Sequence, residues 1–170
     1  MKTIILIFVF SFLLPMGLFA QDMQPPPPIN NEFFNASIGD WISDEYEMMG
    51  MKWKEDVNIS WALNKQFVVI TTKSTSDKGM PYESIGYMTV DKEGNTKTYF
   101  FDNWGMEGIM EFTGKIEGST STMEGGNKWM KSKGKMIMEK GAMINEMTFT
   151  MPGADGKEVT QDMKISYHKK

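Results

Sequence analysis

The sequence of 170 residues contains no cysteine and no arginine, and its only histidine is His168. The absence of cysteine excludes disulfides, thiolate metal sites, a cysteine nucleophile and a lipid-anchoring cysteine. The absence of arginine removes the planar five-donor group that binds phosphates and carboxylates through two bonds at once. Together with a formal net charge of -4, it argues against a nucleic-acid partner.

Leucine is also scarce. Beyond residue 20 the only leucine is Leu63, against sixteen methionines, which are the 18 of the whole chain less Met1 and Met16. Methionine therefore takes the place of the long aliphatic side chain.

The first twenty residues have the features of a secretory signal peptide. Lys2 precedes an apolar run over 4–14, and the segment ends on the small residue Ala20. We predict cleavage after Ala20. Because the run is too short to span a bilayer, we expect no stable membrane insertion after cleavage and a periplasmic or secreted protein.

Residues 21–30 follow as a proline-rich spacer, with four consecutive prolines at 25–28. The alternative is a docking site for a proline-reading module. The remaining 31–170 have the length of one domain.

From Gly39 onward the apolar residues recur with a period of two. In 51–61, Met51, Trp53, Val57, Ile59 and Trp61 share one face of a strand, and polar residues occupy most of the other face. The segment 159–168 alternates in the same way.

Seven further strand-like stretches lie between these two, separated by glycine-containing or polar turns: 66–74, 82–91, 96–103, 108–116, 119–124, 128–139 and 142–151. With 39–48 they make about ten strands. One apolar face per strand and short connections predict an all-β, antiparallel up-and-down barrel, since closure removes exposed sheet edges. One short helix is expected over 31–37, whose Phe33 and Phe34 would cap one end.

Several short motifs resemble an uncharacterised bacterial domain-of-unknown-function family predicted to be lipocalin-like (calycin-like). The matching residues are Gly39-Asp40-Trp41, the tryptophan-rich second strand, Asn64-Lys65-Gln66-Phe67-Val68, Ile85-Gly86-Tyr87, Phe101-Asp102-Asn103-Trp104, Gly156-Lys157-Glu158 and Tyr167. The resemblance spans about 31–169 and implies a barrel, with no established chemistry. In lipocalins an arginine packs on the Gly-x-Trp indole, and here only a lysine can do so.

The haem-binding nitrobindins, a related barrel family, use a histidine near the C-terminus as iron ligand, which would correspond to His168. Strand parity places His168 on the polar face with Asp162, Lys164 and Ser166. We therefore expect a solvent-exposed histidine, no haem and no other cofactor.

The methionines allow two interpretations. Met48-Met49-Gly50-Met51, Met136-x-Met138 and the Met143, Met147, Met151 series could bind Cu(I) through their thioethers. Parity instead places most of the later methionines on the inward face, where they would fill the barrel. We favour core packing and predict no metal site.

Two acidic residues stand out. Glu55 lies on the apolar face between Trp53 and Val57, where it would either orient the polar end of a ligand or sit at the rim beside a lysine. Asp102 would act in a ligand site or as a turn cap. Asp44, Glu45 and Glu47 are expected to be solvent-exposed.

No paired acids, Ser-His set or phosphate-binding loop is apparent, so we predict no catalytic residues. The sequence favours a barrel that binds a small hydrophobic molecule. The expected ligand-binding residues are Trp53, Glu55, Val57, Ile59, Asp102, Met136, Met138, Met147, Phe149 and Met163. The alternative is an envelope structural or interaction protein with a filled core and an unidentified protein partner.

Overall fold

The computed structural model describes residues 25–153 and 155–170, so the predicted signal peptide lies outside the described residues. The elements are α2 (Glu32–Ser37), β1 (Gly39–Ser43), β2 (Tyr46–Met48), β3 (Met51–Ala62), β4 (Phe67–Ser76), β5 (Pro81–Val90), β6 (Asn95–Asp102), the 3-10 helix η1 (Gly105–Gly108), β7 (Met110–Glu117), β8 (Thr120–Gly126), β9 (Lys131–Glu139), β10 (Ala142–Pro152) and β11 (Glu158–Lys169).

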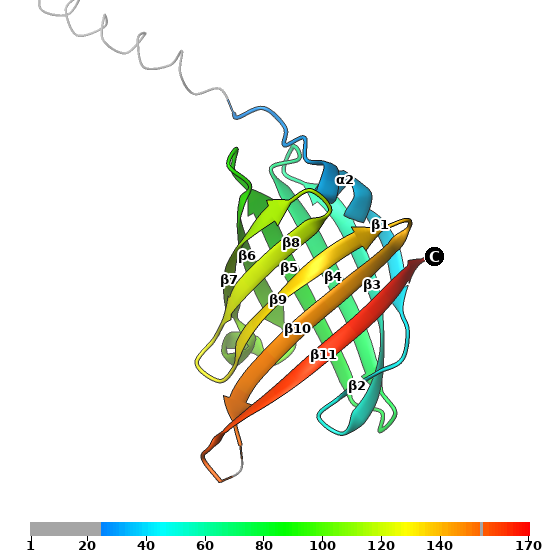
Figure 1. The fold of residues 1–170 in the computed structure, drawn as a ribbon, viewed down its shortest axis with the longest axis vertical. Helices are drawn as coiled ribbons and strands as arrows, with labels where there is room; N and C mark the ends of the chain where they lie inside the picture. Colours follow the sequence, from blue (N-terminus) through cyan, green and yellow to red (C-terminus); the bar gives the residue numbers. More distant parts are fainter. Residues whose placement is uncertain (1–24, 154) are drawn as a thin grey trace, which may run out of the picture.

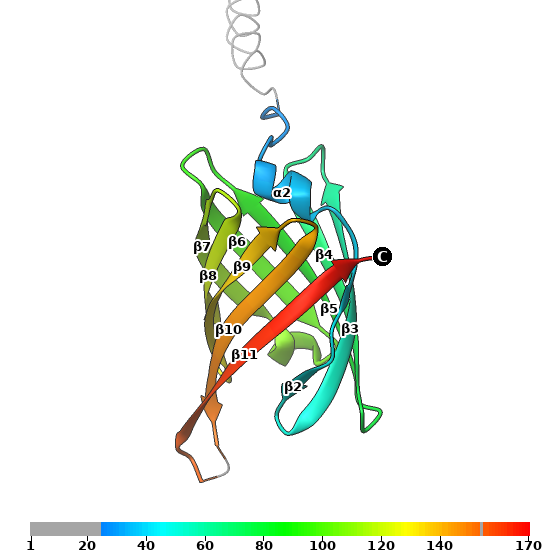
Figure 2. The same ribbon diagram turned by 45° about the vertical axis from the view of Figure 1, so that its right-hand side comes forward.

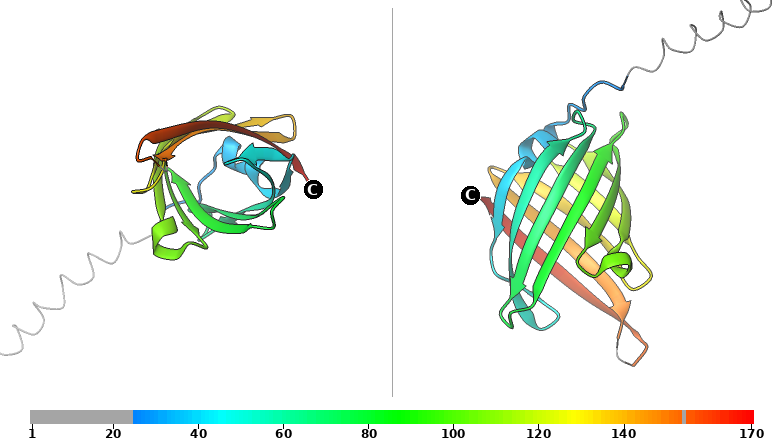
Figure 3. Two further views of the ribbon diagram at one scale, coloured as in Figure 1. Left: turned by 90° about the horizontal axis from the view of Figure 1, so that it is seen from below. Right: turned by 180° about the vertical axis from the view of Figure 1, so that it is seen from behind.

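The strands form one closed antiparallel sheet (Figure 1). From β3 to β11 each strand pairs with the next along the chain, and β1 pairs with both β11 and β3. Because β1 and β2 both lie along β3, they are two segments of one strand position in a ten-stranded barrel. The predicted all-β up-and-down barrel is confirmed, and Figure 3 shows the closed ring in end view.

The observed strand limits differ from the predicted ones in three places. The predicted strand 39–48 is broken at Asp44, whose amide turns away to donate to the carbonyl of Ser166 at 2.8 Å. The strand predicted from 108 begins at Met110 because η1 occupies the preceding residues, and the one predicted from 128 begins at Lys131. At η1 and at 127–130, where the Asn127 side chain accepts from the Trp129 and Met130 amides, a local turn overrides the apolar alternation.

Helix α2 closes one end of the barrel (Figure 2). Asn31 caps it by accepting a hydrogen bond from the Phe34 amide at 3.1 Å. Phe33 and Phe34 are buried, as predicted, in a cluster with Trp41 and inward-facing residues of β3, β4 and β10.

The tryptophan of the Gly-x-Trp motif, Trp41, packs under a lysine as the sequence predicts. The Lys169 ammonium lies 5.2 Å from the ring centroid of Trp41, and the Trp41 indole N–H donates to the Ser37 carbonyl at 2.8 Å. The motif therefore ties the helix, the first strand and the last strand together at the α2 end.

The proline-rich segment contacts the barrel over its described part. The side-chain amide of Gln66, in the β3–β4 turn, donates to the carbonyls of Pro26 and Pro27 at 3.1 and 2.9 Å. The Ile29 amide donates to the Lys65 carbonyl at 3.1 Å. These bonds hold 26–29 against the same end of the barrel as α2.

Candidate functional site in the barrel interior

Glu55 is 8 % exposed and points into the barrel from β3. One carboxylate oxygen accepts a hydrogen bond from the Tyr167 hydroxyl at 2.6 Å, and the other accepts from the Ser74 hydroxyl at 3.2 Å. The Tyr46 hydroxyl also contacts the carboxylate, and the Glu55 amide donates to the Ser43 hydroxyl at 2.9 Å. Hydroxyl groups, and not a cation, therefore surround this buried acid.

Strand register explains why these groups meet. Glu55 is the cross-strand neighbour of Ser74, and Ser74 of Tyr82. On the other side Ser43 is the neighbour of Tyr167. Because side chains at paired positions point to the same face of a sheet, residues far apart in the chain form one inward-facing row.

Burial shifts the pKa values of the titratable side chains in this row. It raises the pKa of Glu55 above its ordinary value, while the hydrogen bonds from Tyr167, Ser74 and Tyr46 act in the opposite direction. Burial, and then the adjacent Glu55 charge, raise the pKa of Tyr46 and of Tyr167. A hydrogen bond from Asn145 to the Tyr167 oxygen opposes this rise. We call Tyr46, Glu55, Ser74, Asn145 and Tyr167 the Glu55 cluster.

Asp102 lies on β6, three strands from Glu55 in the same sheet. Its carboxylate accepts from the Trp104 amide at 2.9 Å, which is the predicted turn-capping bond, and from the Tyr82 hydroxyl at 3.4 Å. It also packs against the α-carbon of Gly108, where any Cβ would collide with it. Burial raises the pKa of Tyr82, and the Asp102 charge adds to that rise.

An apolar surface follows inward-facing positions of β6 to β11, so its centre lies across the barrel from Glu55 and its edge on β10 and β11 borders Asn145 and Tyr167. It contains four buried residues with four partly buried ones packed against them: Met110, Phe112, Met123 and Met147, with Phe100, Met130, Phe149 and Met163. We call this set the methionine wall. The interior therefore has a polar side and a soft, polarisable apolar side.

The end of the barrel opposite α2 carries exposed apolar side chains at or beside each of its connections. They are Met49, Met80, Trp104, Met106, Ile109, Trp129 and Val159, which we call the apolar rim. Trp104 and Met106 are 71 % and 86 % exposed. Among the exposed large apolar residues of 25–153 and 155–170, only Leu63 lies at the α2 end, and Phe101 lies on the outer wall beside Tyr87.

Part of the apolar rim is fixed in place. The Trp129 indole donates to the Glu107 carboxylate at 2.7 Å, and the same carboxylate forms an ion pair with Lys128 at 2.6 Å. The Asn127 side chain also donates to the Glu107 carbonyl at 2.9 Å. These contacts hold the indole in a defined position although it is 55 % exposed.

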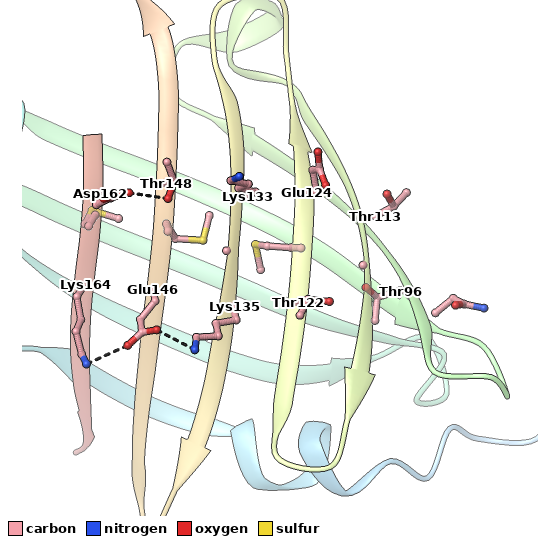
Figure 4. A pocket seen from close by; sticks show the side chains of 16 residues that line it. Thr96, Thr113, Thr122, Glu124, Lys133, Lys135, Glu146, Thr148, Asp162 and Lys164 are labelled. Atoms are coloured by element: carbon pink, nitrogen blue, oxygen red, sulfur yellow. Dashed lines mark hydrogen bonds and ion pairs between the residues drawn. The ribbon is translucent and has the colours of Figure 1, made fainter. Parts of the chain in front are cut away.

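A groove of about 1040 Å³ crosses β6 to β11 (Figure 4). Its lining includes exposed side chains of outward parity such as Lys133, Lys135 and Lys164, and also three residues of the methionine wall, Met123, Met147 and Met163. Glu146 pairs with both Lys135 and Lys164, at 3.1 and 3.0 Å. Because these charges compensate each other, we place the candidate site in the interior.

The structure places the predicted ligand-binding residues in four different surroundings. Val57 and Ile59 belong to the packed core below α2, and Met136 and Met138 pack against that core. Trp53 is buried, and its indole donates to the Met48 carbonyl at 3.2 Å. Met147, Phe149 and Met163 belong to the methionine wall, and Glu55 and Asp102 lie on the polar side.

The prediction of a rim lysine beside Glu55 is wrong. The alternating lysines of β3, Lys52 and Lys54, point outward with the opposite parity, so hydroxyls contact the carboxylate instead. The prediction for His168 is confirmed, since its side chain is 60 % exposed and lies 3.3 Å from Asp44. Inward packing is confirmed for most methionines, while Met49, Met80 and Met106 are exposed.

Sequence reasoning missed the polar partners of Glu55 and the apolar rim. The signal for Ser74 was present, because strand β4 places Thr72, Ser74 and Ser76 on the same face as Val68 and Ile70. Where the inward residues of one strand change from apolar to polar, the barrel interior is expected to become polar. Tyr46 and Asn145 had no such signal, because their proximity depends on the register between distant strands.

Within 25–153 and 155–170 no group of three or more His, Asp or Glu side chains could hold a metal ion. No helix in that part of the chain has the length and apolar character needed to cross a bilayer.

No protein-family model and no curated protein matches the chain. Among solved structures it is similar to Rv2717c from M. tuberculosis, with a TM-score of 0.64 and 14 % identity over 84 % of this chain and 99 % of that one. It also aligns with two barrels solved with DFHBI. The redesigned barrel mFAP1 gives a TM-score of 0.46, at 11 % identity over 82 % of this chain and 100 % of that one. EF1p2_mFAP2b gives 0.48, at 11 % identity over 80 % and 95 %. The likeness to Rv2717c shows that the two chains share one fold.

Proposed function

We propose that this chain is an exported, non-catalytic barrel that binds a small, mainly apolar molecule in the half of its interior away from α2. The observation that carries the proposal is the asymmetry of the two ends. One end is closed by α2 over a packed core, and the other end presents the apolar rim.

The half of the interior near the apolar rim contains inward side chains that are not fully buried. Tyr46, Tyr82, Phe149 and Met163 point inward but are only half-buried. The solvent contact that they retain is the surface that an apolar guest would cover, at about 25 cal/mol per Å² of apolar area removed from water. Methionine suits an irregular guest because its side chain adapts its shape.

The test is titration of the full chain with a neutral apolar fluorophore such as N-phenyl-1-naphthylamine. Phe149→Gln places a polar group on the methionine wall, and we expect it to weaken binding at least tenfold. Thr150→Gln is the matched control, because Thr150 is the next residue of β10 and has outward parity. We expect it to change binding less than twofold.

Native mass spectrometry of the protein isolated from the organism that makes it is the second measurement. A bound mass released by organic extraction supports the proposal. If the wild-type protein binds no fluorophore and shows only the mass of the chain without a ligand, the result would instead support the alternative, a structural or interaction protein with a filled barrel.

A further inference from the structure

Building on the proposed function, we infer that the polar end of the ligand is a hydrogen-bond donor, an amine or an alcohol, and that Glu55 selects it against a carboxylate. The inference concerns the ligand class of the same interior site.

The first argument for a donor group on the ligand is the charge of the interior. The inward-facing positions of the described strands carry two carboxylates, Glu55 and Asp102. The one lysine at an inward register position, Lys169, is exposed at the α2 end, where its ammonium lies over Trp41. A ligand carboxylate near Glu55 would therefore meet like charge and no cation, which disfavours its charged form.

The direction of the hydrogen bonds supports it independently. Tyr167 and Ser74 donate their hydroxyl hydrogens to Glu55, so what these hydroxyls can still offer a ligand is oxygen lone pairs. Among the described residues, the side-chain oxygen of Asn145 is buried without a hydrogen-bond partner. Carboxylate, amide and hydroxyl oxygens together form a surface of acceptors that a donor group would complement.

Two further unpartnered hydroxyls lie on the opposite side. Within the described chain, Ser121 and Ser132 are 1 % and 4 % exposed, point inward from β8 and β9, and make no hydrogen bond. Ser132, at the apolar-rim end of β9, can accept from or donate to a polar group on the ligand, whereas Ser121 lies at the α2 end of β8. Since leaving a buried hydroxyl unpaired is costly, a guest with donor groups is more complementary to this interior than a pure hydrocarbon.

The experiment compares decylamine, decanol and decanoate at pH 7, below their micelle concentrations, by displacement of N-phenyl-1-naphthylamine from the full chain. These probes share one alkyl chain and differ only at the polar end. We expect the amine and the alcohol to bind at least tenfold more tightly than the carboxylate. Glu55→Gln should remove most of the preference of the amine over the carboxylate while the alcohol still binds.

Glu146→Gln is the matched control, because it removes an equal charge from the outer wall of the same acidic protein and should leave the ranking unchanged. Equal or tighter binding of decanoate to the wild-type chain would overturn the inference and leave the proposed function standing. An amine preference that survives Glu55→Gln would overturn the role of Glu55. If no probe and no fluorophore binds, the proposed function itself fails. The wild-type ranking decides the ligand class even if Glu55→Gln does not fold.

Discussion

Removing one hydroxyl should reveal how much the Glu55 cluster contributes to the stability of the barrel. Tyr167→Phe deletes the 2.6 Å hydrogen bond to the Glu55 carboxylate. Both side chains are buried, at 4 % and 8 % exposure, so water cannot replace the lost donor. A hydrogen bond to a charged group contributes about 1.5–3 kcal/mol, and Glu55 keeps Ser74 and Tyr46 as partners. We therefore expect a loss of about 2 kcal/mol in the free energy of unfolding.

The loss is measured by urea unfolding followed through tryptophan fluorescence. For a domain of this length a change of that size lowers Tm by about 4–8 °C. In a Glu55→Gln background the same hydrogen bond is neutral and contributes about 1 kcal/mol. The double-mutant cycle should therefore give a coupling energy near 1 kcal/mol between the two residues.

Tyr99→Phe is the matched control. The Tyr99 hydroxyl also lies near a glutamate, Glu111, but at 3.4 Å and on the exposed face. We expect this variant to change stability by less than about 0.5 kcal/mol. The reasoning is refuted if Tyr167→Phe is no more destabilising than Tyr99→Phe, or if the coupling energy between Tyr167 and Glu55 is zero.

Three further predictions concern pH, a glycine and the helix cap. Burial raises the pKa of Glu55 above 4.5, so over a range of pH the folded state keeps a proton that the unfolded state has released. The free energy of unfolding should therefore fall as pH rises from about 4.5 through the raised pKa. Urea titrations of Glu55→Gln at several pH values should lack this fall. Gly86→Ala places a Cβ against the ring of Phe100 and should cost about 1–3 kcal/mol, whereas a variant as stable as wild type would show that the ring moves freely. Asn31→Ala should cost about 1 kcal/mol in thermal unfolding, and Asn31→Asp should restore most of it.

The barrel could be predicted because the sequence features that specify it are local. Alternation in segments such as 51–61, and turn residues between them, specify strands that are polar on one face, and short connections leave few antiparallel topologies. The break at Asp44 and the start of β7 at Met110 were not predictable in this way. The break at Asp44 accompanies a hydrogen bond to Ser166, which becomes a neighbour only after the sheet has closed, and the start of β7 follows from the 3-10 helix η1, which strand alternation does not predict.

The candidate site was predictable in its centre and not in its surroundings. Parity identified Glu55 as an acid on an apolar face, but its partner Tyr167 lies 112 residues away. Nothing in the local pattern of 159–168 distinguishes Tyr167 from any other inward aromatic residue. The apolar rim has a different explanation, since Trp104, Met106 and Trp129 lie in connections, where strand parity makes no prediction.

The absence of arginine acquires a specific meaning in this interior. A buried carboxylate must be paired with a cation, surrounded by donors or protonated. The lysines of β3 point outward, and no arginine exists in the chain, so Glu55 is held by hydroxyl donors alone. Hydroxyls stabilise the carboxylate without cancelling its charge, and this leaves a negative potential facing the methionine wall. A ligand with a positive charge or a donor hydrogen would provide the partner for Glu55 that the chain lacks. For this reason we expect Glu55 to act in ligand selection as well as in the stability of the barrel.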